Sequence, residues 1–277
     1  LALFSNILNS YPNAGVGDDE LFFAAVNQTN NGGPSAVTKT GQKSIVAGLN
    51  LKAGRRAIEL SDYRAAFKLF KHGISFLEDG HWTACYKLSL DLFNAAAEAA
   101  CVINNGDAVK IYSDQVVAHA KFFDDKLNCL YCTTQVLRNS EKIADCCDSA
   151  VDLLSRIGEE PLRPLGDAKL NIDIQHMNIV LLNMSDESIL NMGKATSDKN
   201  RIILKLYAMC LSTFQFINPS LKAAVSVQLV SHTLKTGLSA MSPIAFAAYG
   251  ELLAGIGKIP EACRLGTNGR VGIDGNV

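Results

Sequence analysis

Residues 49–77, LNLKAGRRAIELSDYRAAFKLFKHGISFL, contain two segments with apolar side chains at helical spacing, separated by the polar tripeptide SDY. Such a short link favours two antiparallel helices that pack as a hairpin. Gly54 in the first segment and Ala66 in the second are small enough for the two backbones to approach closely. We predict that the helices cross at these residues, with Phe70 filling the gap and Gly73 as a further small residue at the same crossing.

The composition of the chain favours a folded, all-α protein. Its 277 residues are 48% hydrophobic and 19% charged, with a formal net charge of −1, so a sizeable core is affordable. The charge balance gives no basic excess that would indicate a nucleic-acid partner. Runs of alternating β-branched residues next to tight Gly turns are nearly absent, and no apolar run is long enough to predict a membrane span.

Helical periodicity continues through most of the chain. We expect helices at roughly 43–59, 63–77, 81–104, 107–121, 124–138, 140–157, 167–182, 185–193, 197–216, 219–236, 242–256 and 259–265. Upstream, we expect a short helix within residues 1–14 and a second one over Asp19–Gln28, capped by Asp18. The sequence NNGGP at residues 30–34 is expected to end it, and residues 29–42 are expected to be a loop.

Small residues twelve positions apart recur along the chain. The four pairs are Gly54 and Ala66, Ala96 and Ala108, Cys132 and Ala144, and Gly250 and Ala262. Tyr112 takes the place of Phe70 in the second copy. This spacing resembles that of tetratricopeptide units, although the Trp and Pro of their consensus are absent. The pattern therefore predicts antiparallel helical hairpins stacked as a tetratricopeptide-like, right-handed solenoid.

Cysteines form the one cluster with metal-like spacing. Cys129 and Cys132 lie close to the adjacent pair Cys146 and Cys147. All four fall within expected helices, whereas zinc ligands usually lie on turns that wrap around the ion. We therefore expect core thiols, with a metal or redox site at Cys129 and Cys132 as the alternative.

No catalytic or cofactor-binding residues are predicted. The sequence contains no G-x-S-x-G, P-loop or H-E-x-x-H motif, and its five histidines are scattered. Lys52, Arg55 and Arg56 form a basic cluster in the opening stretch. We expect a solvated helix face in which Arg55 pairs with Glu59, and the alternative is a contact to a neighbouring domain or partner peptide.

Three further stretches, together with residues 49–77, resemble one class of protein. These are DDELFFAAVNQTNNGG at 18–33, the segment at 196–237 that begins TSDKNRIILKLYAMC, and SPIAFAAYGELLAGIGKIPEACRLG at 242–266. They resemble the tetratricopeptide-like helical region of large multidomain AAA/STAND-type signalling ATPases. Those proteins also carry serine/threonine kinase, GAF, histidine kinase or nucleotide cyclase domains. Their catalytic motifs have no matching positions in this chain.

The resemblance implies a domain plan and a role. Residues 1–42 would be the exit helices of an ATPase module and a linker. Residues 43–160 would form tetratricopeptide-like hairpins, and residues 161–266 would form further hairpins. Residues 267–277 would be an irregular tail, which suggests a truncated or misjoined end. The chain would be a non-catalytic fragment that couples an ATPase switch to an output kinase or cyclase domain. The adjacent domains of the same protein would be its partners, along with a peptide or protein ligand.

A free-standing tetratricopeptide-type adaptor that binds partner peptides is the alternative. The start at Leu1 rather than Met and the ATPase-like helix at 18–33 favour the multidomain protein. We expect a cytoplasmic location with reduced thiols, because the sequence shows no secretory signal. No cofactor, nucleic acid or membrane is expected among its partners.

Overall fold

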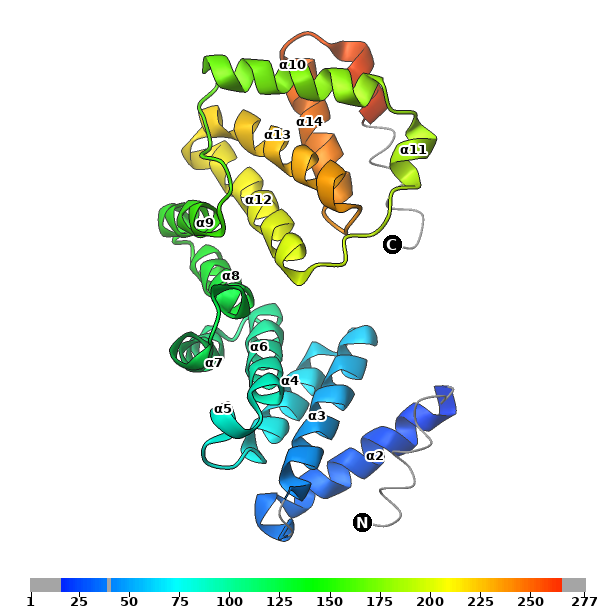
Figure 1. Cartoon of the computed structure of the whole chain (residues 1–277), viewed down its shortest axis with the longest axis vertical. Coiled ribbons are helices and arrows are strands. Elements are labelled where there is room, and N and C mark those ends of the chain that lie inside the picture. Colours follow the sequence, from blue (N-terminus) through cyan, green and yellow to red (C-terminus); the bar gives the residue numbers. More distant parts are fainter. Residues whose placement is uncertain (1–15, 39–40, 266–277) are drawn as a thin grey trace. The chain divides into compact units, whose positions relative to one another are not determined.

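The computed structural model describes residues 16–38 and 41–265, and these residues are almost entirely helical (Figure 1). The chain divides into two compact units, residues 1–136 and 137–277, which are described separately below. Within the described residues there is no β-strand, only an isolated bridge between Lys194 and Leu238. None of the helices in this part of the chain combines the length and the apolar character needed to cross a bilayer.

Unit 1 is a series of helices joined by short turns. In chain order they are α2 (Val16–Gly32), the 3-10 turn η2 (Pro34–Ala36), α3 (Gln42–Glu59), α4 (Tyr63–Ser75), α5 (His81–Ala84), α6 (Tyr86–Val102), α7 (Gly106–His119) and α8 (Phe123–Asn139), whose last residues enter unit 2. α3 packs on α4, α4 on α6, and α6 on α7, so consecutive helices are neighbours in space. α2 lies across α3 (Figure 1).

The predicted crossing of α3 and α4 is present. A Cβ atom added to Gly54 would lie 2.2 Å from Phe70 Cε1, so the Phe70 ring occupies the space that a side chain at position 54 would need. Ala66 and Phe70 are both fully buried. A Cβ at Gly73 would lie 2.6 Å from Leu92 Cδ2 and 3.1 Å from Asn50 Cβ. Gly73 therefore lets α4 approach α3 and α6 at once.

One kind of turn closes five of the described helices. Ser61, Asn104, Glu141, Gly158 and Gly257 all have positive φ, at 62°, 57°, 60°, 97° and 83°. In each turn the N–H of the next residue donates to a carbonyl five positions back, as from Asp62 N to Ala57 O at 2.8 Å. This is the Schellman arrangement, which satisfies carbonyl groups at a helix C-terminus. In the first two turns the next residue also caps the following helix, as Asp62 does with Ala65 N.

The turns correct the predicted register of two repeat copies. Counted from the positive-φ residue, the positions equivalent to Gly54 and Ala66 are Ala97 and Val109 in the second copy, and Thr134 and Cys146 in the third. All four of these residues are buried. The predicted partners Ala96 and Ala108 are also buried, but Tyr112 is only half-buried and Ala144 is exposed. The prediction was therefore one residue out of register in the second copy and two in the third.

Unit 2 contains α9 (Ile143–Ile157), α10 (Ala168–Leu182), α11 (Asp186–Leu190), α12 (Asp198–Ile217), α13 (Pro219–Thr236), α14 (Ser242–Gly255) and a helical segment at 259–265. α12, α13 and α14 pack side by side, with α9 against α12 and α10 against α13 (Figure 1). Tyr249 Oη donates to Ile174 O at 2.8 Å and so joins α14 to α10. A Cβ at Gly250 would lie 3.2 Å from Ala262 O, so α14 and the segment at 259–265 approach each other closely at this pair.

Several expected helix limits were wrong. The helix expected at 81–104 is interrupted at Cys85, whose φ and ψ of −139° and 54° are not helical. α2 begins at Val16 and continues through Asn31 to Gly32, so the expected loop at 29–42 is partly helical. The short helix expected in residues 1–14 and the tail at 267–277 lie outside the described residues.

The crossing at Gly54 yields a testable difference between two glycines of the same helix. Gly54→Ala should lower the free energy of unfolding by about 1–3 kcal/mol, because the buried Phe70 ring has no room to retreat. Gly48→Ala, where a Cβ would meet nothing within 4 Å, should raise it by about 0.5–1 kcal/mol. Urea unfolding followed by circular dichroism measures both. Equal effects of the two substitutions would contradict the crossing, and Phe70→Leu should partly rescue Gly54→Ala.

Candidate functional site: the joint between α2 and the first hairpin

A buried pair of amides joins α2 to α3. Asn30 Nδ2 donates to Asn50 Oδ1 at 2.8 Å, and Asn50 Nδ2 donates back to Asn30 Oδ1 at 2.9 Å. Asn50 Nδ2 also donates to Val46 O at 3.0 Å. Asn50 is fully buried and Asn30 is 7% exposed, so each side chain depends on the other for its hydrogen bonds. The pair fixes the register of α2 on α3, because a shift along either helix would leave buried polar atoms unpaired.

The basic cluster of the opening stretch is engaged mainly within unit 1. Arg56 donates from Nε and Nη2 to Asp19 Oδ2 at 2.9 and 2.7 Å, and from Nη1 to Glu59 Oε2 at 2.6 Å. The hydrogen bond to Asp19, and to a smaller extent the one to Glu59, raises the pKa of Arg56. Asp19 lies on α2, so this ion pair is a second tie between α2 and α3. The joint is defined here as Asp19, Asn30, Asn50 and Arg56.

The other two basic residues have different surroundings from those predicted. Arg55 pairs with Asp91 of α6, with Nη2 3.2 Å from Oδ2, whereas Glu59 pairs with Arg56. The predicted Arg55–Glu59 pair was therefore wrong. Lys52 Nζ lies 5.8 Å from the centre of the Phe22 ring of α2. All three residues thus contact neighbouring helices of the same unit, and a contact to an external partner stays a prediction.

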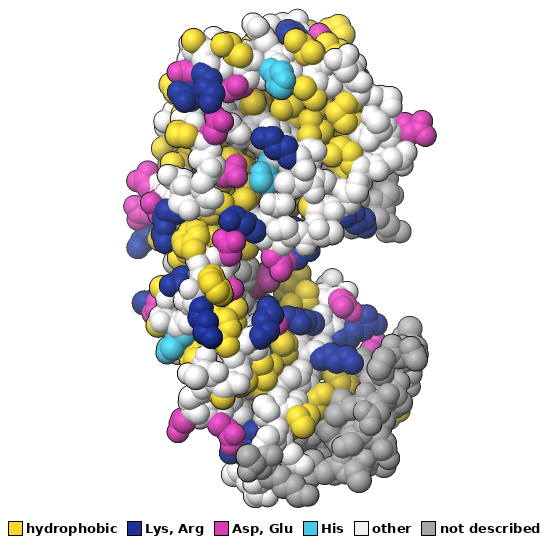
Figure 2. All heavy atoms as spheres, viewed as in Figure 1, with side chains coloured by type: hydrophobic (Ala, Val, Ile, Leu, Met, Phe, Trp, Pro, Cys, Tyr) yellow, Lys and Arg dark blue, Asp and Glu magenta, His cyan; other side chains and the backbone are white. Residues whose placement is uncertain are grey.

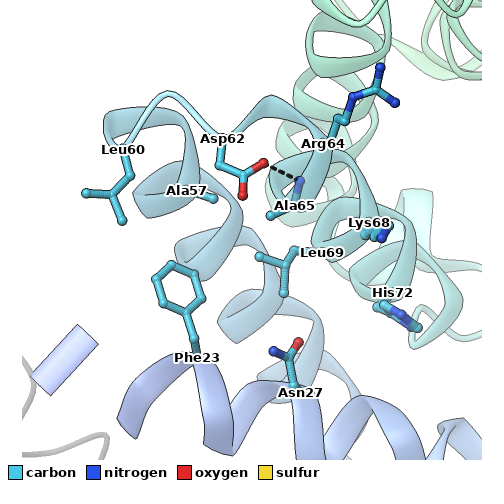
Figure 3. Close-up of a pocket in the computed structure, with 10 residues that line it drawn as sticks. All are labelled: Phe23, Asn27, Ala57, Leu60, Asp62, Arg64, Ala65, Lys68, Leu69 and His72. Carbon is cyan, nitrogen blue, oxygen red and sulfur yellow. Dashed lines mark hydrogen bonds between the residues drawn. The ribbon is translucent and has the colours of Figure 1, made fainter. Parts of the chain in front are cut away.

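A groove lies beside the joint. Its ten lining residues are Phe23, Asn27, Ala57, Leu60, Asp62, Arg64, Ala65, Lys68, Leu69 and His72, and it encloses about 690 Å³ (Figure 3). The floor is apolar and comes from all three helices: Phe23 from α2, Ala57 from α3, and Leu69 from α4. Leu60, at the end of α3, is 55% exposed at the edge of the groove. Sequence reasoning missed this site because its lining combines three helices.

Basic side chains form one wall of the groove. Arg64, Lys68 and His72 are four residues apart on α4, so they lie on one face of the helix, and all three are exposed. No ion pair joins any of them to another described residue. Asp62 is the one acidic residue in the lining, and its Oδ1 accepts a hydrogen bond from Ala65 N. This wall is named the basic row.

The cysteines lie in packed surroundings. Cys129 and Cys132 are buried, and Cys129 Sγ donates to Asn94 Oδ1 at 3.1 Å. Burial raises the pKa of Cys129 to about 12, and a hydrogen bond with the Cys101 side chain together with burial raises that of Cys132. Cys146 and Cys147 are buried in unit 2. Within residues 16–38 and 41–265, no three His, Cys, Asp or Glu side chains converge as metal ligands would.

Unit 2 has a polar cluster that sequence reasoning also missed. Glu159 follows α9, and its Oε2 accepts a hydrogen bond from Tyr207 Oη of α12 at 2.7 Å. Its Oε1 lies 3.9 Å from His232 Nδ1 of α13. Burial and the hydrogen bond to Glu159 raise the pKa of Tyr207. Burial lowers the pKa of His232, against the opposing effect of the Glu159 charge. The cluster therefore favours the neutral form of His232 and ties the end of α9 to α12 and α13.

In comparisons with known proteins, no family model matches the chain, and no curated protein or solved structure matches it either.

The amide pair should behave as one energetic unit. Asn30→Ala and Asn50→Ala should each lower the free energy of unfolding by about 1–3 kcal/mol, because each leaves a buried amide without a partner. The double variant should lose clearly less than the sum, with a coupling free energy of about 0.5–3 kcal/mol. Urea titration of the four proteins measures this cycle. Strict additivity would show that the two amides do not depend on each other.

The thiols should differ sharply in their rate of alkylation. At pH 8, iodoacetamide should modify Cys263, which is exposed, much faster than Cys129 or Cys132, because burial and raised pKa values suppress the reactive thiolate. Peptide mass spectrometry after timed labelling measures the rates, and labelling in urea is the control for intrinsic reactivity. Fast modification of Cys129 in the folded protein would contradict the core-thiol interpretation.

Proposed function

We propose that the chain is a non-catalytic helical scaffold that couples an ATPase switch to an output kinase or cyclase domain of a multidomain signalling protein. The observation that carries this proposal is the joint. α2 contains most of the stretch that resembles the exit helix of an ATPase module, and it is tied to the first hairpin by a buried amide pair and an ion pair. A helix held in this way moves together with the hairpin, so a displacement of α2 is passed on.

The repeated turns support the second part of the proposal, a tetratricopeptide-like right-handed solenoid. The Schellman turns at Ser61, Asn104, Glu141 and Gly257 are each followed by the next helical segment two residues later, which is the regular short link that a repeated hairpin would have. Stacked hairpins contact mainly their neighbours, so such an array can bend and transmit a displacement along its length. The domain limits expected from the sequence, at 42, 160 and 266, belong to this proposal.

A free-standing adaptor is the second candidate, and the groove is the observation that favours it. An apolar floor beside the basic row is suited to a peptide whether or not an ATPase module precedes the chain. The complete coding sequence separates the two candidates. The coupling role expects a Walker A motif upstream and an output domain downstream, and a gene that encodes this chain alone would overturn it.

In the intact protein, breaking the joint should weaken coupling. Arg56→Met should reduce the change in output activity that ATP produces, because α2 loses its ion pair with α3. Lys110→Met is the matched control, since it breaks an exposed ion pair with Asp114 inside α7 alone. Output activity with and without ATP is the measurement. An unchanged ATP response in the Arg56 variant would count against the joint, and ATP turnover by the purified 277-residue chain would contradict a non-catalytic role.

A further inference from the structure

We infer that the groove formed by α2, α3 and α4 binds an acidic amphipathic helix of a protein partner. This inference rests on the proposed scaffold function and adds to it the chemical class of the partner that the scaffold would bind. Two properties of the groove support it: the apolar floor and the basic row along one wall. Figure 2 shows Lys and Arg side chains in the region of α3 and α4, next to hydrophobic side chains and to a few Asp and Glu side chains.

The spacing of the basic row matches a helix laid alongside α4. Arg64, Lys68 and His72 follow one another at intervals of four residues, which is a rise of about 6 Å along the helix axis. Acidic side chains on successive turns of a second helix repeat at about 5.4 Å. Two helices that lie nearly parallel can therefore pair their side chains turn by turn, whereas a small anion would reach only one or two of the three side chains of the basic row.

The charge balance of the lining favours an acidic occupant. Arg64 and Lys68 are cations, and Asp62 is the one carboxylate among the lining residues. The Asp62 carboxylate already caps α4 through Ala65 N. A second hollow of about 420 Å³ shares Asp62 and Arg64 and continues to Val102, which is 54% exposed. The basic row thus lies between the groove and the second hollow, and both of these contain apolar side chains. An amphipathic helix with acidic residues along one edge would complement this arrangement in charge and in hydrophobicity.

The floor supplies the apolar part of the contact. Phe23 is half-buried, and Leu60 exposes 55% of its surface at the edge of the groove. Covering these side chains would remove apolar surface from water, which is the main favourable term in association. Leu residues spaced three and four apart on the partner helix would reach both of them from one face.

The test is direct binding of a designed probe to the full chain. The probe is a fluorescein-labelled helical peptide of about four turns, with Leu on one face and Glu along its edge. Fluorescence anisotropy should show saturable binding below about 1 mM that weakens as salt is added. A peptide with Lys in place of each Glu, and one with Ser in place of each Leu, should bind at least about tenfold more weakly.

Variants of the chain locate the site. Lys68→Glu and Arg64→Glu should each weaken binding of the acidic peptide by about three- to tenfold, and Leu60→Ser by a similar factor. Lys71→Glu is the matched control, because Lys71 is exposed on the same helix but does not line the groove, and it should bind as the unmodified chain does. Circular dichroism confirms that each variant keeps its fold.

Three outcomes would overturn the inference. The first is no binding of the acidic peptide, and the second is equal binding of the Lys-substituted peptide. The third is equal binding of the Ser-substituted peptide or of inorganic polyphosphate, which would indicate a general polyanion site. Each of these leaves the coupling role standing, because that role is tested by the coding sequence and by the Arg56 variant. A gene without an ATPase module would conversely leave the measured peptide affinity unchanged.

Discussion

The close approach of α3 and α4 is the constraint on which the rest of unit 1 depends. Gly54 has no side chain, so the Phe70 ring lies directly against the α3 backbone and is fully buried there. Gly73, one turn further along α4, makes room for Leu92 of α6. The two glycines therefore place three helices around one packed core. A larger residue at either position would have to displace a buried side chain that has no free space to enter.

The joint is built directly on this crossing. Asn50 forms hydrogen bonds with Asn30 of α2 and also packs closely against Gly73 of α4, where a Cβ atom would lie 3.1 Å from Asn50 Cβ. Polar groups in such a place add little net stability, but they penalise every arrangement that separates them. The Asn30–Asn50 pair is therefore better suited to fixing where α2 sits than to strengthening the core. This is the property that a helix needs if its position is to be passed on to the hairpin.

Sequence reasoning recovered the helices and the first crossing, because apolar periodicity and two glycines in one hairpin are strong local signals. The register of the third copy is not evident from the sequence because Glu141, a residue type uncommon at positive φ, occupies the positive-φ position of the turn. The break at Cys85 has no Gly or Pro to mark it. The amide pair was out of reach for a different reason, since Asn30 was assigned to a loop and its partner lies twenty residues away.

The charged residues show how proximity in sequence differs from proximity in space. Lys52, Arg55 and Arg56 are close together in the sequence, yet they contact different helices. Arg55 forms an ion pair with Asp91, and Arg56 forms ion pairs with Asp19 and Glu59. The Lys52 ammonium group lies near the Phe22 ring. Arg64, Lys68 and His72 are each separated by three other residues in the sequence, so they do not form a visible cluster there. Helical spacing places them together along one wall, and none of them is paired with another described carboxylate. The positive wall beside the groove of unit 1 is therefore set by the helical period of α4 and not by the cluster of Lys52, Arg55 and Arg56.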